Sequence, residues 1–297
     1  MAMTRVTRRG FLAGLSAAGA AAAWGRFAVA AEEEKGPSTQ WKRGTDLVTL
    51  GRNGLKTTVL GIGTGTVGGS KQRALGTERF TRLARHALER GIRYIDTADM
   101  YGMHIFVQIA LAGVPRDKYF IQTKTQAKTP ELAKADIDRF RRELGIETID
   151  SLLMHCMTTG SWPTDMRPVM DVLDEAKRKG RVRAVGISCH GFEPLAASAE
   201  SDWPDIQLAR INPFGILMDD KPERVAAQLK KMHAKGRGVL GMKVYGESGF
   251  GSREKRLQSL KYVLGLGCVD AFTIGFQSIQ ELDETLDLIE QAHAPRA

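Results

Sequence analysis

The feature that most constrains the fold is a repeated alternation of short apolar runs with longer amphipathic stretches. The apolar runs have the length and composition of strands, and they cover residues 58–62, 94–97, 119–123, 151–154, 182–187, 206–211, 238–242 and 271–274. Stretches with helical spacing lie between most of them, at 79–90, 131–144, 169–178, 222–234, 253–264 and 279–292. Strands that alternate with helices form parallel βαβ units. Eight such units in about 250 residues predict an α/β fold with a closed (β/α)8 TIM barrel, and an open doubly wound sheet is the alternative.

A short segment before the first barrel strand has the pattern of a β-hairpin. Residues 46–50 and 56–59 flank Asn53-Gly54, a dipeptide typical of tight hairpin turns. We expect this hairpin to form a plug beneath the barrel. The hairpin and the barrel together would occupy residues 46–297, after a polar linker at 31–45.

The first 30 residues have the layout of an export signal. Arg8 and Arg9 precede a mildly apolar stretch at 11–23, and a small-residue cleavage pattern follows at 28–30. The Arg-Arg-x-Phe-Leu sequence resembles a twin-arginine signal, and the apolar stretch is shorter than the ~20 residues of a membrane span. We therefore expect a signal peptide at 1–30, the twin-arginine export machinery as a partner, a periplasmic location and no stable membrane span after cleavage. An amphipathic helix with incidental arginines, or an uncleaved anchor, is the alternative.

Charge and cysteine content exclude several other classes. The net charge of +9 includes four arginines in the expected signal, and without them 39 basic residues face 34 acidic ones. No aromatic residues are interleaved with the basic clusters, so a nucleic-acid partner is not expected. The three cysteines, Cys156, Cys189 and Cys268, form no zinc motif, and no metal site is expected. Cys156 and Cys189 end neighbouring expected strands, so whether they pair stays open.

Polar residues stand where four consecutive expected strands end. They are Asp96, Lys124, His155 and Ser188, and Tyr101 follows on the loop after Asp96. Active sites of α/β barrels are built at the carboxyl ends of the strands, so we expect these side chains to meet there. Buried charges are costly unless they pair, which predicts an ion pair between Asp96 and Lys124.

The same residues carry a resemblance to a known family. The chain resembles the aldo-keto reductases in order and spacing over about residues 48–290, and most closely their exported, twin-arginine members. The matching segments are Tyr94-Ile-Asp-Thr-Ala-x-x-Tyr101-Gly102, Thr123-Lys124, Asp150-Ser-Leu-Leu-Met-His155 and Val182-Arg-Ala-Val-Gly-Ile-Ser188.

This resemblance implies hydride transfer between a nicotinamide nucleotide and a small-molecule aldehyde or ketone. Tyr101 would be the general acid/base, although a tyrosine pKa of about 10 is high for a proton donor near neutrality. Lys124 beside the phenol would favour the phenolate and lower that pKa, and Asp96 would hold Lys124. His155 would orient the substrate oxygen.

The resemblance also implies a nucleotide site, with NADP(H) expected and NAD(H) possible. Gln277 stands where NADP-specific members often carry a basic residue, and Thr285 replaces the usual Asn. Lys243 follows the seventh strand, where an aromatic residue commonly stacks on the nicotinamide. The residues expected to bind the cofactor are Gly63, Thr64, Gly65, Ser188, Lys243, Gly275, Gln277, Ser278 and Glu284.

Two other functions are compatible with the sequence. Lys124 at a strand end could form a Schiff base with a carbonyl substrate, as strand-end lysines of barrels can. A non-catalytic, exported binding protein could retain the four residues as a relic. The loops at 158–167 and 214–221 would determine the substrate, and their sequences do not identify it.

Overall fold

The computed structural model of the protein describes residues 42–293. The expected signal peptide and most of the expected linker lie outside the described residues. Between residues 42 and 293, none of the helices combines the length and the apolar character that crossing a membrane requires.

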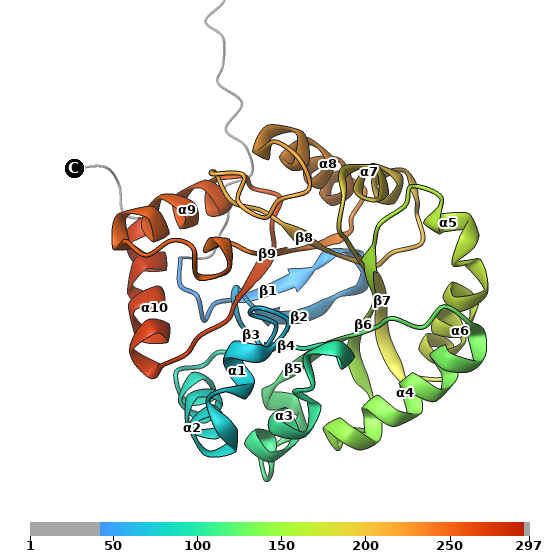
Figure 1. Cartoon of the computed structure of the whole chain (residues 1–297), viewed down its shortest axis with the longest axis horizontal. Helices are drawn as coiled ribbons and strands as arrows, with labels where there is room; N and C mark the ends of the chain where they lie inside the picture. Colours follow the sequence, from blue (N-terminus) through green and yellow to red (C-terminus); the bar gives the residue numbers. More distant parts are fainter. Residues whose placement is uncertain (1–41, 294–297) are drawn as a thin grey trace, which may run out of the picture. The chain divides into compact units, whose positions relative to one another are not determined.

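The core of the protein is a closed barrel of eight parallel strands. Neighbouring strands follow the order β10-β3-β4-β5-β6-β7-β8-β9, and β10 pairs with β3 to close the barrel (Figure 1). The prediction of a (β/α)8 TIM barrel is therefore confirmed. The strands are β3 (Leu60–Gly63), β4 (Tyr94–Asp96), β5 (Phe120–Thr125), β6 (Ile149–Met157), β7 (Val182–Cys189), β8 (Ile206–Arg210), β9 (Gly238–Met242) and β10 (Ala271–Ile274).

The expected hairpin lies at the amino-terminal end of the barrel. Strands β1 (Leu47–Leu50) and β2 (Leu55–Thr58) pair in antiparallel register, and the backbone N–H of Arg52 donates to the carbonyl of Gly236, just before β9. The turn is longer than the two residues Asn53-Gly54, because a 3₁₀ turn, η1 (Gly51–Asn53), precedes Gly54. A Cβ atom on Gly51 would lie 2.4 Å from the backbone nitrogen of Gly238, so contact with the barrel determines this turn.

The helices surround the barrel and cover its outer surface (Figure 1). The six expected helices are present, and Thr129 accepts a hydrogen bond from the N–H of Leu132 at the start of α4, as a helix cap should. Four helices were not expected, namely α1, α3, α5 and α7. The helices are α1 (Ser70–Arg73), α2 (Gly76–Glu89), α3 (His104–Leu111), α4 (Pro130–Leu144), α5 (Trp162–Asp165), α6 (Arg167–Arg178), α7 (Phe192–Glu200), α8 (Pro222–Ala234), α9 (Arg253–Gly265) and α10 (Ile279–His293).

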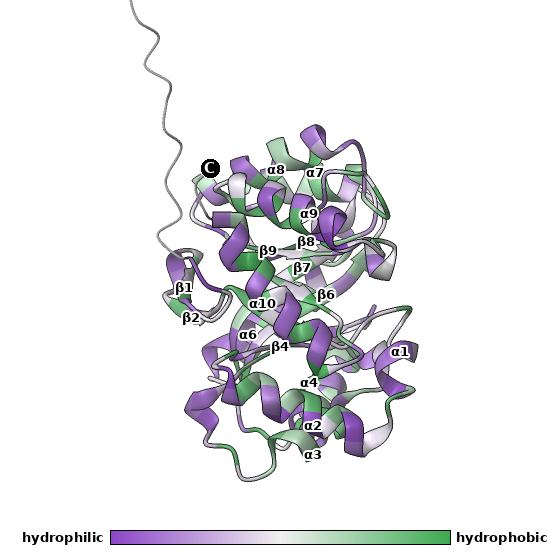
Figure 2. Ribbon diagram, turned by 90° about the vertical axis from the view of Figure 1, so that its left-hand side faces the viewer, coloured by the Kyte–Doolittle hydropathy of each residue, from purple (hydrophilic) through white to green (hydrophobic). Residues whose placement is uncertain are grey.

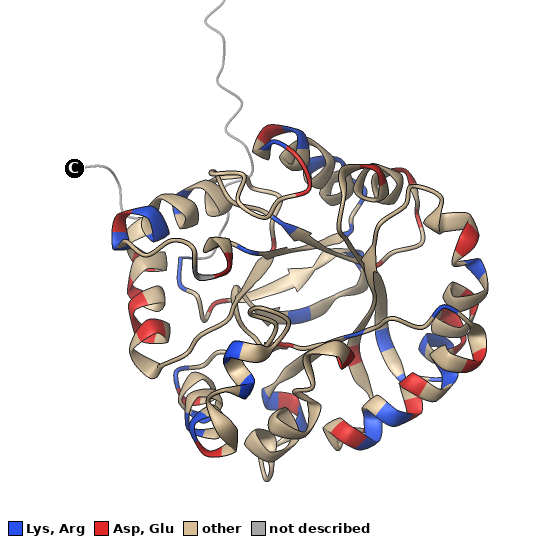
Figure 3. Cartoon of the chain, viewed as in Figure 1, with Lys and Arg blue, Asp and Glu red and all other residues tan. Residues whose placement is uncertain are grey.

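The distribution of polar residues follows from this layered arrangement. The helices carry both hydrophilic and hydrophobic residues, as a layer between core and solvent requires (Figure 2). Lys and Arg are interspersed with Asp and Glu on several of these helices, such as α4 and α6 (Figure 3). Salt bridges within one helix, such as Arg167 with Asp171 and Lys179 with Glu175, reflect this mixture.

Candidate active site

Asp96 and Lys124 form a buried ion pair at the carboxyl end of the barrel. Asp96 ends β4 and Lys124 lies near the end of β5, the neighbouring strand. Lys124 Nζ donates to Asp96 Oδ1 at 2.7 Å and to the carbonyl of Thr97 at 2.8 Å, and the Lys124 side chain has no exposed surface. Burial lowers the pKa of Lys124, and the charge of Asp96 opposes that shift. The predicted pairing is therefore present in the structure.

A chain of hydrogen bonds fixes the carboxylate of Asp96. Gln122 Nε2 donates to Asp96 Oδ1 and to the hydroxyl of Tyr94, both at 2.8 Å. Ser151 Oγ in turn donates to Gln122 Oε1 at 3.1 Å. All of these residues are buried, and the hydrogen bonds hold Asp96 in one orientation.

Tyr101 lies above this pair, at the end of a 3₁₀ turn. The turn, η2 (Asp99–Tyr101), follows β4, and the Lys124 Nζ lies 5.0 Å from the centroid of the Tyr101 ring. Gly65 packs against the ring, because a Cβ atom there would lie 2.5 Å from Tyr101 Cζ and 2.9 Å from its hydroxyl oxygen. Only 9% of Tyr101 is exposed. A residue larger than glycine at position 65 would displace the phenol.

The protonation of Tyr101 differs from the expectation. Burial raises the pKa of Tyr101 well above its usual value, and the charges of Asp96, Cys156 and Glu247 raise it further. The ammonium group of Lys124 lies 5.0 Å from the ring centroid and favours the phenolate, but its hydrogen bonds go to Asp96 and Thr97 and none goes to the phenol. The net direction of the shift is upward, so the phenol retains its proton near neutrality, and the favourable charge of Lys124 does not outweigh burial.

His155 completes the group of four predicted residues. It lies in β6, and its Nε2 is 3.4 Å from the hydroxyl of Tyr101. The two rings meet edge to face, with centroids 5.5 Å apart. Burial, assisted by the positive charges of Lys124 and His190, lowers the pKa of His155 to about 2. His155 is therefore neutral at physiological pH, and among the described residues its Nδ1 has no hydrogen-bond partner.

A β-bulge in β6 shapes the rim beside His155. Cys156 has a left-handed backbone, with φ of 58°, and its N–H donates to Ser188 Oγ at 3.0 Å. Cys156 Sγ lies 3.5 Å from Nε2 of His190. Cys156, Cys189 and Cys268 are free thiols, so the open question of a Cys156–Cys189 disulfide is answered against pairing in this structure.

An ionic network on the outer side holds the turn that carries Tyr101. Arg139 of α4 donates to both carboxylate oxygens of Asp99, at 2.7 and 2.9 Å, and to Glu143 at 3.2 Å. His104 Nδ1 lies 2.7 Å from Glu143, and its Nε2 lies 2.8 Å from the hydroxyl of Thr123. Asp99, His104 and Glu143 are close enough to ligate a metal ion, but Arg139 already supplies the positive charge. This cluster therefore holds η2 in place.

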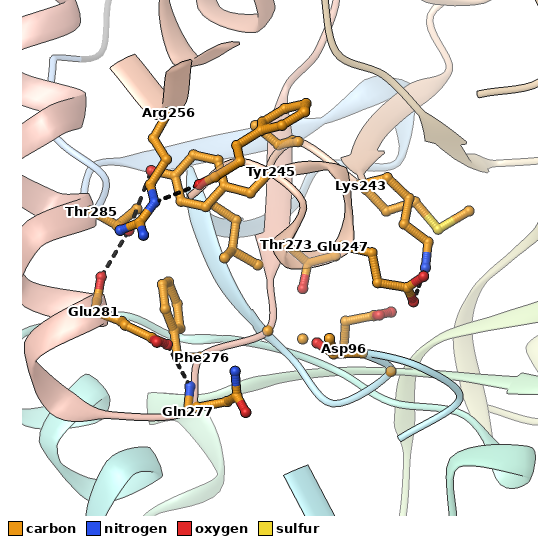
Figure 4. A pocket seen from close by; sticks show the side chains of 18 of the residues that line it. Asp96, Lys243, Tyr245, Glu247, Arg256, Thr273, Phe276, Gln277, Glu281 and Thr285 are labelled. Atoms are coloured by element: carbon orange, nitrogen blue, oxygen red, sulfur yellow. Dashed lines mark hydrogen bonds and ion pairs between the residues drawn. The ribbon is translucent and has the colours of Figure 1, made fainter. Parts of the chain in front are cut away.

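A cavity of about 300 Å³ opens beside Asp96 and Tyr101 and extends toward α9 and α10 (Figure 4). This volume is at the lower end of the range usual for small-molecule sites. Asp96, Lys243 and Glu247 lie toward one end of the cavity, and Arg256, Glu281 and Thr285 lie toward the other (Figure 4). Its full lining is Gly63, Gly65, Thr66, Asp96, Tyr101, Met242, Lys243, Val244, Tyr245, Glu247, Phe250, Arg256, Thr273, Ile274, Gly275, Phe276, Gln277, Glu281 and Thr285.

Five of the nine residues expected to bind the cofactor line this cavity, namely Gly63, Gly65, Lys243, Gly275 and Gln277. The other four have different surroundings. Thr64 is buried, and both its N–H and its hydroxyl donate to the carbonyl of Asp96, so it positions Asp96. Ser188 accepts from Cys156. Ser278 accepts from the N–H of Glu281 at the start of α10, and Glu284 pairs with Arg256 at 2.8 Å.

Several cavity residues were not selected from the sequence. Arg256 lies in the first turns of α9. The sequence there, with Ser252 as the cap, is typical of any helix start and does not indicate a ligand site. Glu281 has the same ambiguity, because a Glu three residues after a serine is typical of helix caps. Glu247 accepts from the N–H of Val67 and pairs with Lys243, which joins two loops at the cavity. Thr273 lies in β10 and lines the cavity. Side chains alternate between the two faces of a strand, so its polar position within this apolar run could have indicated the site.

Comparison with known proteins agrees with the fold. A sequence model of the Aldo/keto reductase family matches residues 59–259. The chain is 29% identical over 160 residues to an aldo-keto reductase of Mycolicibacterium paratuberculosis, covering 50% of each chain. It is 36% identical over 115 residues to a glycerol 2-dehydrogenase (NADP(+)) of Saccharomyces cerevisiae, covering 36% of this chain and 34% of that one. The chain thus spans about half the length, or less, of these relatives.

A solved structure supports the fold independently. The aldo-keto reductase of Bacillus halodurans, in its holo form, superposes with a TM-score of 0.67 at 20% identity, covering 85% of this chain and 92% of that one. The barrel and the strand-end cluster define a protein of the (β/α)8 class with a polar site at the carboxyl ends of its strands. The chain belongs to the aldo/keto reductase family.

Proposed function

We propose that this chain is an NAD(P)H-dependent oxidoreductase that reduces an aldehyde or a ketone to an alcohol, or catalyses the reverse oxidation. The observation that carries this proposal is the placement of Tyr101. Its hydroxyl lies at the wall of a cavity, within 3.4 Å of His155 and directly above the Lys124–Asp96 pair. Family membership supports the same reaction class.

Tyr101 supplies the proton in this account. Its raised pKa keeps the hydroxyl protonated through the neutral range, so the donor form is always present. As the carbonyl oxygen gains charge, that oxygen becomes a stronger base than the phenolate and takes the proton. Lys124 then stabilises the phenolate through its positive charge, and solvent returns the proton. His155, which is neutral, orients the oxygen by hydrogen bonding.

The cavity residues fit a nicotinamide nucleotide, which would supply the hydride that the carbonyl carbon receives. A Cβ atom at Gly63 would lie 2.7 Å from Thr273 Oγ1, so glycine at this position keeps that part of the cavity wall uncrowded. Among the described residues, that Thr273 hydroxyl is buried without a hydrogen-bond partner, so it is free for a ligand. The amino end of α10 adds backbone N–H groups, which suit an anionic ligand.

The two alternatives have less support from the geometry. A Schiff base requires an accessible, unprotonated lysine, whereas Lys124 is fully buried and donates to two oxygens. A non-catalytic binding protein has no need for a phenol held over an ion pair. No observation favours either function over carbonyl reduction.

We also propose that the protein is exported to the periplasm by the twin-arginine machinery. The sequence of residues 1–30 supports this location. Replacing Arg8 and Arg9 together by Lys should retain the protein in the cytoplasm. Amino-terminal sequencing of the exported protein should begin near Ala31, and an intact Met1 in a periplasmic fraction would contradict cleavage.

The reaction class is tested by incubating the full chain with NADH or NADPH and a panel of aldehydes and ketones. We expect oxidation of the nucleotide with formation of equal amounts of alcohol. Borohydride reduction of the same mixtures should leave no substrate attached to Lys124. Covalent trapping at Lys124 would instead support the Schiff-base function, and the absence of nucleotide binding would contradict the proposal.

A further inference from the structure

We propose that this cavity selects NAD(H) over NADP(H), with the carboxylate of Glu281 as the group that recognises the adenosine ribose. The inference rests on the proposed function and concerns the same site. Reduction at Tyr101 requires the nicotinamide to lie at the Asp96 and Tyr101 end of the cavity. The adenosine half must then lie toward Arg256, Glu281 and Thr285, at the opposite end (Figure 4).

Glu281 places a negative charge at that end. Its Oε2 accepts from the backbone N–H of Gln277 at 2.7 Å, just before α10 begins (Figure 4). This N–H belongs to the helix start that would otherwise favour a phosphate. Among residues 42–293, no Lys or Arg forms an ion pair with Glu281, so its charge is not neutralised.

The basic residues of the cavity are already paired. The cavity lining includes two, Lys243 and Arg256. Lys243 pairs with Glu247, and Arg256 donates to Glu284 at 2.8 Å and to the carbonyl of Phe250 at 3.0 Å. A 2′-phosphate carries up to two negative charges, and it would meet Glu281 without a free cation to compensate.

An unphosphorylated ribose has the complementary chemistry. Its 2′- and 3′-hydroxyls donate hydrogen bonds, and a carboxylate only accepts them. Nucleotide-binding folds use this contrast, with an acidic residue on the ribose 2′-hydroxyl for NAD and an arginine near the 2′-phosphate for NADP. Gln277 adds neutral polar groups next to Glu281 and no positive charge.

Arg256 provides the competing possibility, since it could turn toward a 2′-phosphate. To do so it would leave the carbonyl of Phe250 and also Glu284, which would keep only the longer contact with Arg253 at 3.8 Å. Glu281 would still repel the phosphate. The geometry therefore favours a ribose with free 2′- and 3′-hydroxyls. Recognition of a 2′-phosphate by Arg256 would instead appear as tighter binding of NADPH.

The test is equilibrium binding of NADH and NADPH to the full chain by calorimetry. The variants are Glu281→Gln, which removes the charge and keeps an acceptor for the Gln277 N–H, and Glu290→Gln, the same change at an exposed position of α10 that does not line the cavity. We expect the Kd for NADH to be about tenfold lower than that for NADPH in the unmodified chain and in Glu290→Gln. In Glu281→Gln the two values should become equal to within about twofold, with an unchanged melting temperature.

Three results would overturn the inference. Tighter binding of NADPH by the unmodified chain would show that Arg256 recognises the phosphate. An unchanged NADH preference in Glu281→Gln would show that another group discriminates. Binding of neither nucleotide would contradict the proposed function itself, and the inference with it, so the two failures can be told apart.

Discussion

The ammonium group of Lys124 lies 2.7 Å from Oδ1 of Asp96, and burial separates both side chains from solvent. Breaking a buried pair leaves an uncompensated charge, which typically costs about 3–5 kcal/mol. We therefore expect Asp96→Asn and Lys124→Met each to lower the free energy of unfolding by about 3 kcal/mol. Urea unfolding measures the change.

The double variant provides the control for this prediction. If the two residues act as a pair, Asp96→Asn combined with Lys124→Met should lose clearly less than the sum of the single losses. Simple additivity would show that Asp96 and Lys124 contribute independently. Activity should be lost in all three variants, so stability is the informative readout.

The contact between Gly65 and Tyr101 gives a second prediction. A Cβ atom at position 65 would lie 2.5 Å from Tyr101 Cζ, so Gly65→Ala must displace the phenol. Displacement of a reacting group by about 1 Å can cost about 100-fold in rate. We expect kcat to fall by at least about tenfold, whereas Gly265→Ala, where a Cβ atom meets nothing within 4 Å, should leave kcat unchanged. Equal rates for Gly65→Ala and the unmodified chain would place Tyr101 outside the reaction.

The bidentate contact of Arg139 with Asp99 gives a third prediction. Arg139 touches neither the cavity nor Tyr101, but it holds the turn on which Tyr101 lies. We expect Arg139→Gln to lower kcat by about tenfold and leave the Kd of the nucleotide unchanged, because only the proton donor is misplaced. Arg141→Gln, on the same helix, removes ion pairs with Glu147 and Asp138 that do not involve the turn carrying Tyr101, and it should change neither value. Loss of nucleotide affinity in Arg139→Gln would indicate a general structural role.

The pH dependence of the reaction follows from two shifted pKa values. The pKa of Tyr101 is raised, so its proton-donating form persists from low pH to beyond about pH 10. His155, with a pKa lowered to about 2, stays neutral above that pH. We expect kcat for carbonyl reduction to be flat between about pH 6 and about pH 9. The reverse oxidation needs the phenolate, so its rate should rise with pH throughout that range.

A contrary pH profile would be equally informative. A loss of reductive kcat with an apparent pKa near neutrality would show that bound nucleotide lowers the pKa of Tyr101 or raises that of His155. Measurement of kcat instead of kcat/KM is essential here, because kcat reports ionisations in the substrate complex.

The barrel could be predicted from the sequence because its strands are short apolar runs that alternate with amphipathic stretches, and polar residues stand at the ends of four of them. The ion pair between Asp96 and Lys124 could be predicted as well, because opposite charges buried at the ends of adjacent strands are costly unless they pair. Helix α3 (His104–Leu111) was missed because its Ile, Phe and Val residues are equally typical of a strand. Packing between α2 and α4, and not local preference alone, makes it a helix.

The less predictable part of the site depends on contacts between distant segments. Thr64 matches a nucleotide loop in sequence, but its hydroxyl donates to Asp96, 32 residues away. The pKa of Tyr101 depends on its burial and on the charges that the fold brings around it, neither of which can be read from sequence order. Arg256 and Glu281 come from different helices, and only the fold brings them to one cavity.

The most direct test of the account is turnover by Tyr101→Phe, compared with Tyr262→Phe as a matched change on α9 that does not line the cavity. Steady-state oxidation of the reduced nucleotide is measured with a carbonyl substrate that the unmodified chain accepts. We expect Tyr101→Phe to lose at least about 100-fold in kcat while its Kd for the nucleotide changes less than about twofold, and Tyr262→Phe to match the unmodified chain. Full activity of Tyr101→Phe would contradict the account.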